Sequence, residues 1–201
     1  RRHTRSGRVT GVQTWLFRSW ETEGKIPHVR LDYSTDGGWT FPYSIASSAR
    51  DLDHGYELYL RLVRGVAFTP LAFALPVGHA LRVLAPKGKF TLQPDDDRIH
   101  LFVSSGTGIA PFVSMTRTLL ADGRPRRAIF LNGVSYVSDI GYADLLNGWQ
   151  ASGEYPATYV PTVSRPDDPA NAGWAGRRGR VETVIRPALT DLGVEIGRAH
   201  V

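Results

Sequence analysis

The sequence predicts two domains, an antiparallel β-barrel over residues 1–96 followed by an α/β domain with a parallel sheet over residues 97–201. The first half contains short apolar or alternating runs separated by turn residues. In the second half, apolar runs alternate regularly with segments of helical spacing. Between them lies the polar, turn-rich stretch from Gln93 to Asp97, which predicts the domain boundary.

Five runs in the first half predict strands. Glycine- and proline-containing turns separate them, notably at Asp36–Gly38, Pro76–Gly78 and Pro86–Gly88. Several short strands at this spacing favour an antiparallel barrel or sandwich. The predicted strands are Val9–Leu16, His28–Tyr33, Tyr56–Val63, Ala80–Leu84 and Lys89–Leu92.

Strands alternate with helices in the second half. Strands joined through helices form a parallel sheet with right-handed crossovers, and such sheets bind ligands beyond the carboxyl ends of their strands. Because Arg198–Val201 has the pattern of another opening strand, we expect the domain to be truncated at its C-terminus. The predicted elements are strands Ile99–Val103, Arg127–Gly133 and Ala157–Val163, and helices Pro111–Ala121, Gly141–Ser152 and Val181–Leu192.

The composition, with 42% hydrophobic residues in 201, is that of a globular protein. The absence of cysteine excludes disulfides and a cysteine-ligated iron–sulfur cluster within this sequence. The six histidines lack metal-ligand spacing, so we expect no metal site. No apolar run approaches the roughly 20 residues of a membrane-spanning helix, and the start lacks the apolar core of a signal peptide. We therefore expect a cytoplasmic protein with no membrane partner.

The charge balance favours an acidic partner or a phosphorylated ligand. The net charge is +5 and the pI about 9.7. Arginines gather at Arg1–Arg8 and Arg177–Arg180, and no nucleic-acid module signature accompanies them. We therefore expect no nucleic-acid partner.

The most informative segment is Ser104–Phe112, with the sequence SSGTGIAPF, which follows a predicted strand and precedes a predicted helix. Gly106 and Gly108 permit backbone angles closed to other residues and let a ligand approach the main chain. The amides that open the next helix carry positive partial charge. The segment therefore suits a phosphate or a flat cofactor ring; the alternative is a tight turn that only joins the strand to the helix.

A second segment, Phe41–Ser48, has the sequence FPYSIASS. Together with SSGTGIAPF it resembles the ferredoxin:NADP reductase family, and the likeness covers residues 42–201. That resemblance implies a flavin-binding barrel followed by a pyridine-nucleotide domain. The other matching segments are Phe68–Pro70, Gly88–Leu92, Asp139–Tyr142, Tyr159–Arg165 and Gly176–Val181.

The resemblance implies that Pro42, Tyr43, Ser44 and Ile45 run along the flavin. Tyr43 packs on the isoalloxazine ring, and the Ser44 hydroxyl lies near N5, the atom that accepts hydride. Ser44 is thus one of two predicted catalytic residues; the alternative for the segment is a surface strand with a buried tyrosine. Where the family has an arginine for the flavin pyrophosphate, this chain has Phe41. Two alternatives follow: Arg50 or Arg61 supplies the charge from a neighbouring position, or the flavin binds less tightly.

Two further segments resemble flavin contacts. Gly88, Lys89, Phe90 and Thr91 match a loop whose amides and threonine hydroxyl meet the pyrophosphate; a plain β-turn is the alternative. By position, a strand beneath the adenosine or pyrophosphate part contributes Tyr59, Leu60 and Arg61.

The resemblance also assigns the nucleotide contacts. Thr107, between Gly106 and Gly108, is the second predicted catalytic residue and lies between flavin and nicotinamide, where its small side chain permits close stacking.

Ser164 and Arg165 match residues that bind the 2′-phosphate of NADP, which favours NADPH over NADH. Arg180 is the first choice for a second cation, with Arg177 and Arg178 as alternatives. For each of the three, the other interpretation is a residue of a solvated basic loop.

The predicted function is a flavoprotein oxidoreductase that transfers hydride from NADP(H) to FAD and then single electrons to an acidic ferredoxin or flavodoxin. The sequence leaves FAD against FMN open. One alternative is the reductase component of an oxygenase system. A second is a truncated, non-catalytic nucleotide-binding or interaction module.

Overall fold

The computed structural model describes residues 3–9, 12–17, 28–32, 40–51, 55–66, 68–76, 82–83, 88, 90–93 and 95–195. The chain forms two compact units. Unit 1 comprises Arg1–Arg98 and Thr107–Arg126, and unit 2 comprises Ile99–Gly106 and Arg127–Val201. The glycine turn of SSGTGIAPF therefore falls where the chain passes from unit 2 back to unit 1.

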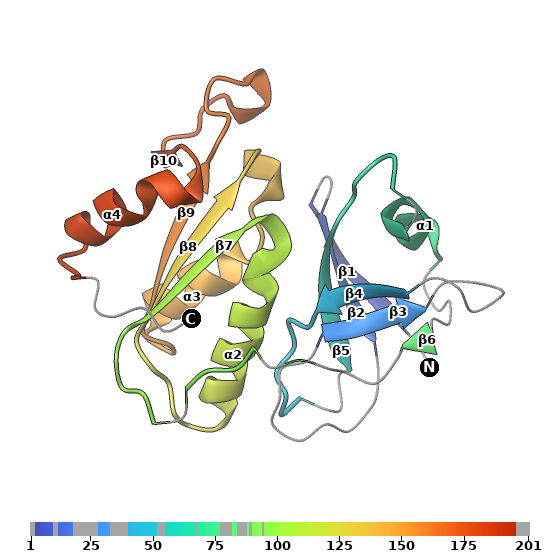
Figure 1. The fold of residues 1–201 in the computed structure, drawn as a ribbon, viewed down its shortest axis with the longest axis horizontal. Helices are drawn as coiled ribbons and strands as arrows, with labels where there is room; N and C mark the ends of the chain where they lie inside the picture. The colour runs from blue at the N-terminus through green and yellow to red at the C-terminus, as the bar shows by residue number, and fades with distance from the viewer. Residues whose placement is uncertain are drawn as a thin grey trace. The chain divides into compact units, whose positions relative to one another are not determined.

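Unit 2 contains a four-stranded parallel sheet of order β10-β9-β8-β7 (Figure 1). The predicted strands and helices of the second half are confirmed, and β10 is an additional short edge strand. The elements of this half are β7 His100–Ser105, β8 Ala128–Val134, β9 Ala157–Val163, β10 Arg177–Arg178, α3 Ala143–Ser152, α4 Val181–Asp191 and the short 3₁₀ turns η2 Val137–Asp139 and η3 Pro169–Asn171.

Helices α3 and α4 cover opposite faces of this sheet. Ile129 and Leu131 of β8 pack with Val181 and Leu189 of α4, and Val160 of β9 borders the same cluster. Successive side chains of a strand point to opposite faces, so Tyr159 lies on the other face. There its hydroxyl donates to the Gly141 carbonyl, 3.5 Å away, just before α3. Burial raises the pKa of Tyr159, which keeps this hydroxyl protonated.

Unit 1 contains two antiparallel sheets of three strands each, β1-β2-β5 and β4-β3-β6. An isolated bridge between Ile45 and Leu58 links the end of β4 to β5. The antiparallel pairing agrees with the sequence prediction, while closure into a flavin-binding barrel stays a prediction. The elements are β1 His3–Val9, β2 Val12–Phe17, β3 His28–Asp32, β4 Thr40–Ser44, β5 Tyr56–Arg61, β6 Arg82–Val83, α1 Phe68–Ala74 and α2 Ala110–Ala121, the last preceded by the 3₁₀ turn η1 Gly106–Ile109.

Two strand predictions for this half were wrong or incomplete, and one helix was not predicted. The single strand predicted over Val9–Leu16 is divided between β1 and β2, which pair with each other from Val9 opposite Val12. Phe90–Leu92 forms no strand, and Lys89 lies outside the described residues. Helix α1 was not predicted, because seven residues are too few to establish a helical period.

The core of unit 1 joins α1 to the strands. Leu58, Leu60 and Phe68 are almost completely buried, and Tyr43 packs against their cluster. Among the residues that the structure describes, no helix combines the length and apolar character that crossing a bilayer requires.

Gly133, near the end of β8, allows α4 to approach the sheet closely. A Cβ added there would lie 2.8 Å from the Val181 Cβ and 3.2 Å from its main-chain nitrogen. We expect Gly133→Ala to lower the free energy of unfolding by about 1–3 kcal/mol, because the helix must shift to relieve this contact. Chemical denaturation of the purified variant measures the effect.

Gly148→Ala is the matched control. Gly148 lies in α3, and an added Cβ meets no atom within 4 Å. Alanine favours the helix by roughly 1 kcal/mol, so this variant should be as stable as the wild type or more so. Equal unfolding midpoints for the two variants would contradict the close packing of α4 on β8.

Candidate functional site

The loops that follow the strands of unit 2 meet at one edge of the sheet, because parallel strands end on the same side (Figure 1). Gly106 follows β7, Tyr136 follows β8, Ser164 and Arg165 follow β9, and Arg180 follows β10. The sheet thus brings the glycine turn and the predicted phosphate-binding residues to a common edge. Ligands of open α/β sheets bind at such an edge.

A buried asparagine holds the turn after β7. Asn132 of β8 is 1% exposed, and its Nδ2 donates to the Ser104 Oγ at 2.9 Å and the Gly106 carbonyl at 3.2 Å. Gly106 has a φ of +54°, a left-handed conformation that glycine adopts without strain. Sequence reasoning missed Asn132, although an asparagine within the apolar strand AIFLN is itself a signal of a buried polar role.

Helix α2 begins with main-chain amides that no side chain caps. The 3₁₀ turn η1 leads into it, and proline stands at its start. Thr107 is half-buried in this turn and Gly108 is exposed. Uncapped amides at the start of a helix favour an anion or a polar ligand group, which is consistent with the predicted roles of Thr107 and Gly108.

The loops after β8 and β9 present a paired tyrosine and arginine. The Arg165 Nη1 donates to the Tyr136 hydroxyl at 2.6 Å, and the Arg165 Cζ lies 5.3 Å from the centroid of that ring. The Arg165 side chain is exposed and Ser164 is half-buried. The Ser164 amide donates to the Val134 carbonyl at 2.8 Å, which ties the two loops together at their base. Sequence reasoning missed Tyr136.

The three arginines proposed for a second cation differ in their surroundings. The Arg177 guanidinium donates to Asp191 of α4 at 2.6 Å and so fastens β10 to that helix. Arg180 is 77% exposed and lies 3.6 Å from Glu182. Arg178 is exposed. Arg177 thus has a structural ion pair with α4, whereas Arg178 and Arg180 are exposed at the end of β10 or after it.

Tyr43 and its neighbours end strand β4 in unit 1. Pro42 is exposed, Tyr43 and Ser44 are half-buried, and Ile45 is 3% exposed. The Tyr43 ring lies 5.4 Å from the Phe68 ring, centroid to centroid. Partial burial raises the pKa of Tyr43, so this residue presents a neutral aromatic surface supported from behind by α1.

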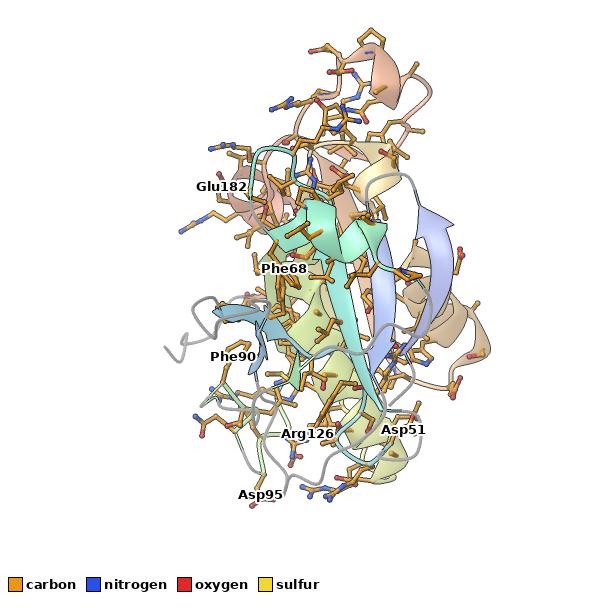
Figure 2. All side chains as sticks on the ribbon, turned by 90° about the vertical axis from the view of Figure 1, so that its right-hand side faces the viewer. Asp51, Phe68, Phe90, Asp95, Arg126 and Glu182 are labelled. Atoms are coloured by element: carbon orange, nitrogen blue, oxygen red, sulfur yellow. The ribbon has the colours of Figure 1, made fainter. Side chains whose placement is uncertain are left out.

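Tyr59 and Leu60 lie in the core, with 6% and 1% exposure, whereas Arg61 is exposed at the end of β5. A ligand would therefore reach Leu60 only through its main chain. Figure 2 labels Phe68 on α1 and Phe90 on the segment before β7.

The second predicted flavin loop is partly described. Phe90 is 50% exposed, and its ring lies 5.7 Å from the Phe112 ring of α2. Gly88 is half-buried and Thr91 exposed, while Lys89 lies outside the described residues. The exposed Phe90 ring is the apolar surface that this loop offers.

Side chains on one face of α2 form hydrogen bonds with the main chain of the segment that follows Ile45. The Ser114 hydroxyl donates to the Ser47 carbonyl at 2.6 Å, and the Ala49 amide donates to the Thr118 hydroxyl at 3.1 Å. The Arg117 Nη1 donates to the Ala46 carbonyl at 3.0 Å.

Ion pairs complete this contact. The same Arg117 nitrogen lies 2.7 Å from Glu57 of β5. Arg50 pairs with Asp122 at 2.7 Å and holds the pKa of that carboxyl below its usual range. Helix α2, which follows the η1 turn that contains Thr107, therefore fixes the main chain directly after Tyr43 and Ser44, a link that the sequence did not reveal.

No group of three or more metal-ligating side chains suited to a metal ion occurs within the part of the chain that the structure describes.

The parallel sheet, the glycine turn and the exposed Arg165 at one edge define a nucleotide-binding α/β domain. Residues 102–201 match the family model of the oxidoreductase NAD-binding domain. The chain carries the NAD-binding domain of the ferredoxin reductase family, which confirms the resemblance read from the sequence.

Two curated relatives illustrate the range of this family. Ferredoxin–NADP reductase B of Sorangium cellulosum is 36% identical over 150 residues, covering 75% of this chain and 59% of that protein. The reductase subunit of an aromatic O-demethylase from Amycolatopsis is 34% identical over 137 residues, covering 65% of this chain and 40% of that protein. The chain thus spans about half the length of these relatives.

Solved structures agree on the fold. The Amycolatopsis cytochrome P450 reductase GcoB has 25% identity and a TM-score of 0.76, with 96% of this chain and 56% of that chain covered. A ferredoxin NADP⁺ reductase from Neisseria gonorrhoeae, solved with bound FAD and NADP, has a TM-score of 0.77 at 18% identity, with 98% and 79% covered. The second likeness concerns the fold alone.

We expect Arg117→Met to lower the free energy of unfolding by about 2 kcal/mol. The substitution keeps an apolar stem but removes a partner of the Glu57 carboxylate, whose side chain is 11% exposed. Urea denaturation measures the change.

The control is Arg124→Met, because Arg124 makes an exposed 3.5 Å pair with Asp95. This variant should unfold almost as the wild type does. If both variants lose the same free energy of unfolding, the contact of α2 with Ala46 and Glu57 does not depend on Arg117.

Proposed function

We propose that the chain is the flavin- and nucleotide-binding part of a reductase that takes hydride from NADPH and passes single electrons to a protein acceptor. One observation carries the proposal. The Asn132-held turn at Gly106 and the exposed Arg165 lie at the same edge of a parallel sheet. A dinucleotide needs both features, a turn that admits a close ligand and a cation for its phosphate.

The residues of unit 1 fit a flavin. Tyr43 offers a half-buried aromatic face braced by Phe68, Ser44 offers a hydroxyl beside it, and Phe90 offers an exposed ring. A bound flavin supplies the chemistry that such a reductase needs, since it accepts two electrons together and releases them one at a time. The proposal includes a flavin-binding barrel over residues 1–96 and a nucleotide domain over residues 97–201.

Two further details belong to the flavin proposal. Arg50, which pairs with Asp122, or Arg61, exposed at the end of β5, is proposed to neutralise the flavin phosphates in place of the arginine that Phe41 replaces. Thr107 is proposed to contact the nicotinamide, because a small side chain leaves room for close stacking.

NADPH is the proposed hydride donor because of Ser164 and Arg165. A hydroxyl and a guanidinium suit a doubly charged 2′-phosphate, whereas an acidic residue at this place would suit the ribose hydroxyl of NADH. Arg180, 77% exposed after β10, is proposed as the second cation.

The proposed electron acceptor is an acidic ferredoxin or flavodoxin, since the chain carries a net charge of +5. A second candidate is the reductase component of an oxygenase system. The similarity to an aromatic O-demethylase reductase subunit and to GcoB favours it equally. The sequence contains no cysteine, so a cysteine-ligated iron–sulfur cluster would require residues outside it.

The test is flavin uptake followed by reduction. The purified chain mixed with FAD should retain the flavin through gel filtration, and the absorption band of the oxidised flavin should bleach anaerobically on addition of NADPH. Failure to take up FAD or FMN would refute the flavoprotein proposal. Flavin retention without bleaching would instead favour a non-catalytic nucleotide-binding or interaction module.

Arg165→Ala tests the nucleotide preference. Charged hydrogen bonds contribute about 1.5–3 kcal/mol, so we expect the KM for NADPH to rise about 10- to 100-fold while that for NADH changes little. Steady-state reduction of ferricyanide by the flavin-loaded chain measures both. Arg186→Ala, which removes an exposed arginine of α4, controls for the lost charge and should leave both constants unchanged. An equal rise for the two nucleotides would exclude a 2′-phosphate role for Arg165.

A further inference from the structure

Asn171 is a buried side chain in the loop between β9 and β10. It is 2% exposed and closes the 3₁₀ turn η3. Its Nδ2 donates to the Arg165 carbonyl at 2.7 Å and to the Ser135 carbonyl at 3.0 Å, while its Oδ1 accepts from the Val137 amide at 2.8 Å. One amide group thus binds main-chain atoms from two different loops.

These contacts surround the Tyr136–Arg165 pair. Ser135 and Val137 are the residues on either side of Tyr136, so Asn171 fixes the main chain before and after that side chain. Asn171 also holds the carbonyl of Arg165 itself. The Arg165 guanidinium then meets the Tyr136 hydroxyl at 2.6 Å, and each partner of the pair is anchored to the same buried amide.

The position of Asn171 is in turn set by its own loop. The Asp168 carboxylate accepts from the Ala170 amide at 2.9 Å, and the Asp168 carbonyl accepts from the Asn171 amide at 2.8 Å. The Asn171 carbonyl accepts from the Trp174 amide at 3.0 Å. The asparagine therefore stands on a turn that is itself hydrogen-bonded.

Arg165 is an exposed residue of a loop, and a long arginine side chain loses conformational entropy when it is fixed. Asn171 holds the Arg165 main chain, and Tyr136 contacts its guanidinium, before any ligand binds. Less entropy is then lost on binding. A ligand group recognised through Arg165 therefore gains affinity from Asn171, although Asn171 does not touch it.

We propose that Asn171 is a positioning residue that presents Arg165, through the Tyr136–Arg165 pair, to the 2′-phosphate of NADPH. The inference rests on the proposed function. It adds that the loops after β8 and β9 together determine the preference for NADP⁺ over NAD⁺. Asn171 affects NADP⁺ binding and leaves NAD⁺ binding almost unchanged.

The experiment is isothermal titration of the full chain with NADP⁺ and with NAD⁺. The variants are Asn171→Ala, Arg165→Ala and the double variant. Asn171→Ala should weaken NADP⁺ binding about five- to tenfold and NAD⁺ binding less than twofold. In the Arg165→Ala background, Asn171→Ala should add less than a twofold change, because its effect passes through Arg165.

Asn147→Ala is the matched control, since Asn147 is an exposed asparagine of α3, and it should bind both nucleotides as the wild type does. Tyr136→Phe keeps the test decisive if Asn171→Ala fails to fold. It removes the hydroxyl that accepts from Arg165 and leaves the main-chain contacts of Asn171 in place. It should also weaken NADP⁺ selectively, by a smaller factor.

Two results would overturn the inference and leave the proposed NADPH function standing. In the first, the wild-type chain prefers NADP⁺ and the Asn171→Ala variant, or Tyr136→Phe if Asn171→Ala does not fold, keeps this preference. In the second, the effect of Asn171→Ala is undiminished in the Arg165→Ala background. A wild-type chain that binds neither nucleotide, or prefers NAD⁺, would overturn the proposed NADPH function and the inference with it.

Discussion

The candidate nucleotide site depends on the parallel pairing of β7 to β10, because parallel strands end at one edge and bring their loops together there. The pairing alone does not fix the loops. Two buried asparagines do so by satisfying main-chain groups of neighbouring loops: Asn132 binds the turn after β7, and Asn171 connects the loops after β8 and β9. A buried amide serves this purpose well, since it offers donors and an acceptor without a charge that must be desolvated.

Unit 1 achieves similar order by a different means. One face of α2, through Ser114, Arg117 and Thr118, contacts the main chain directly after strand β4. The aromatic surface at Tyr43 is thereby held between α1, which contributes Phe68, and a segment fastened to α2. In the proposed flavin-binding role, this bracing would give the ring a preorganised aromatic surface.

The sequence predicted the second half of the fold well and the first half less well, for physical reasons. The apolar run of β8 is buried along its whole length, and those of β7 and β9 are mostly buried or half-buried, so these strands stand out from the amphipathic helices between them. A strand is predicted over Lys89–Leu92, but its described residues Phe90–Leu92 form none, because an exposed loop can also carry apolar residues. Family likeness indicated Arg165, but nothing local in the sequence pointed to Tyr136 or Asn171. Their importance comes from contacts between loops some 30 residues apart along the chain, such as the one from Arg165 to Tyr136, with a sequence separation of 29.

The most direct test of the account is an experimental structure of the chain with bound NADP⁺. The account predicts that the 2′-phosphate accepts hydrogen bonds from the Arg165 guanidinium and the Ser164 hydroxyl, with Asn171 still bound to the main chain of both loops. Density for the adenosine phosphate at another edge of the sheet, or a 2′-phosphate that makes no contact with Arg165, would contradict it.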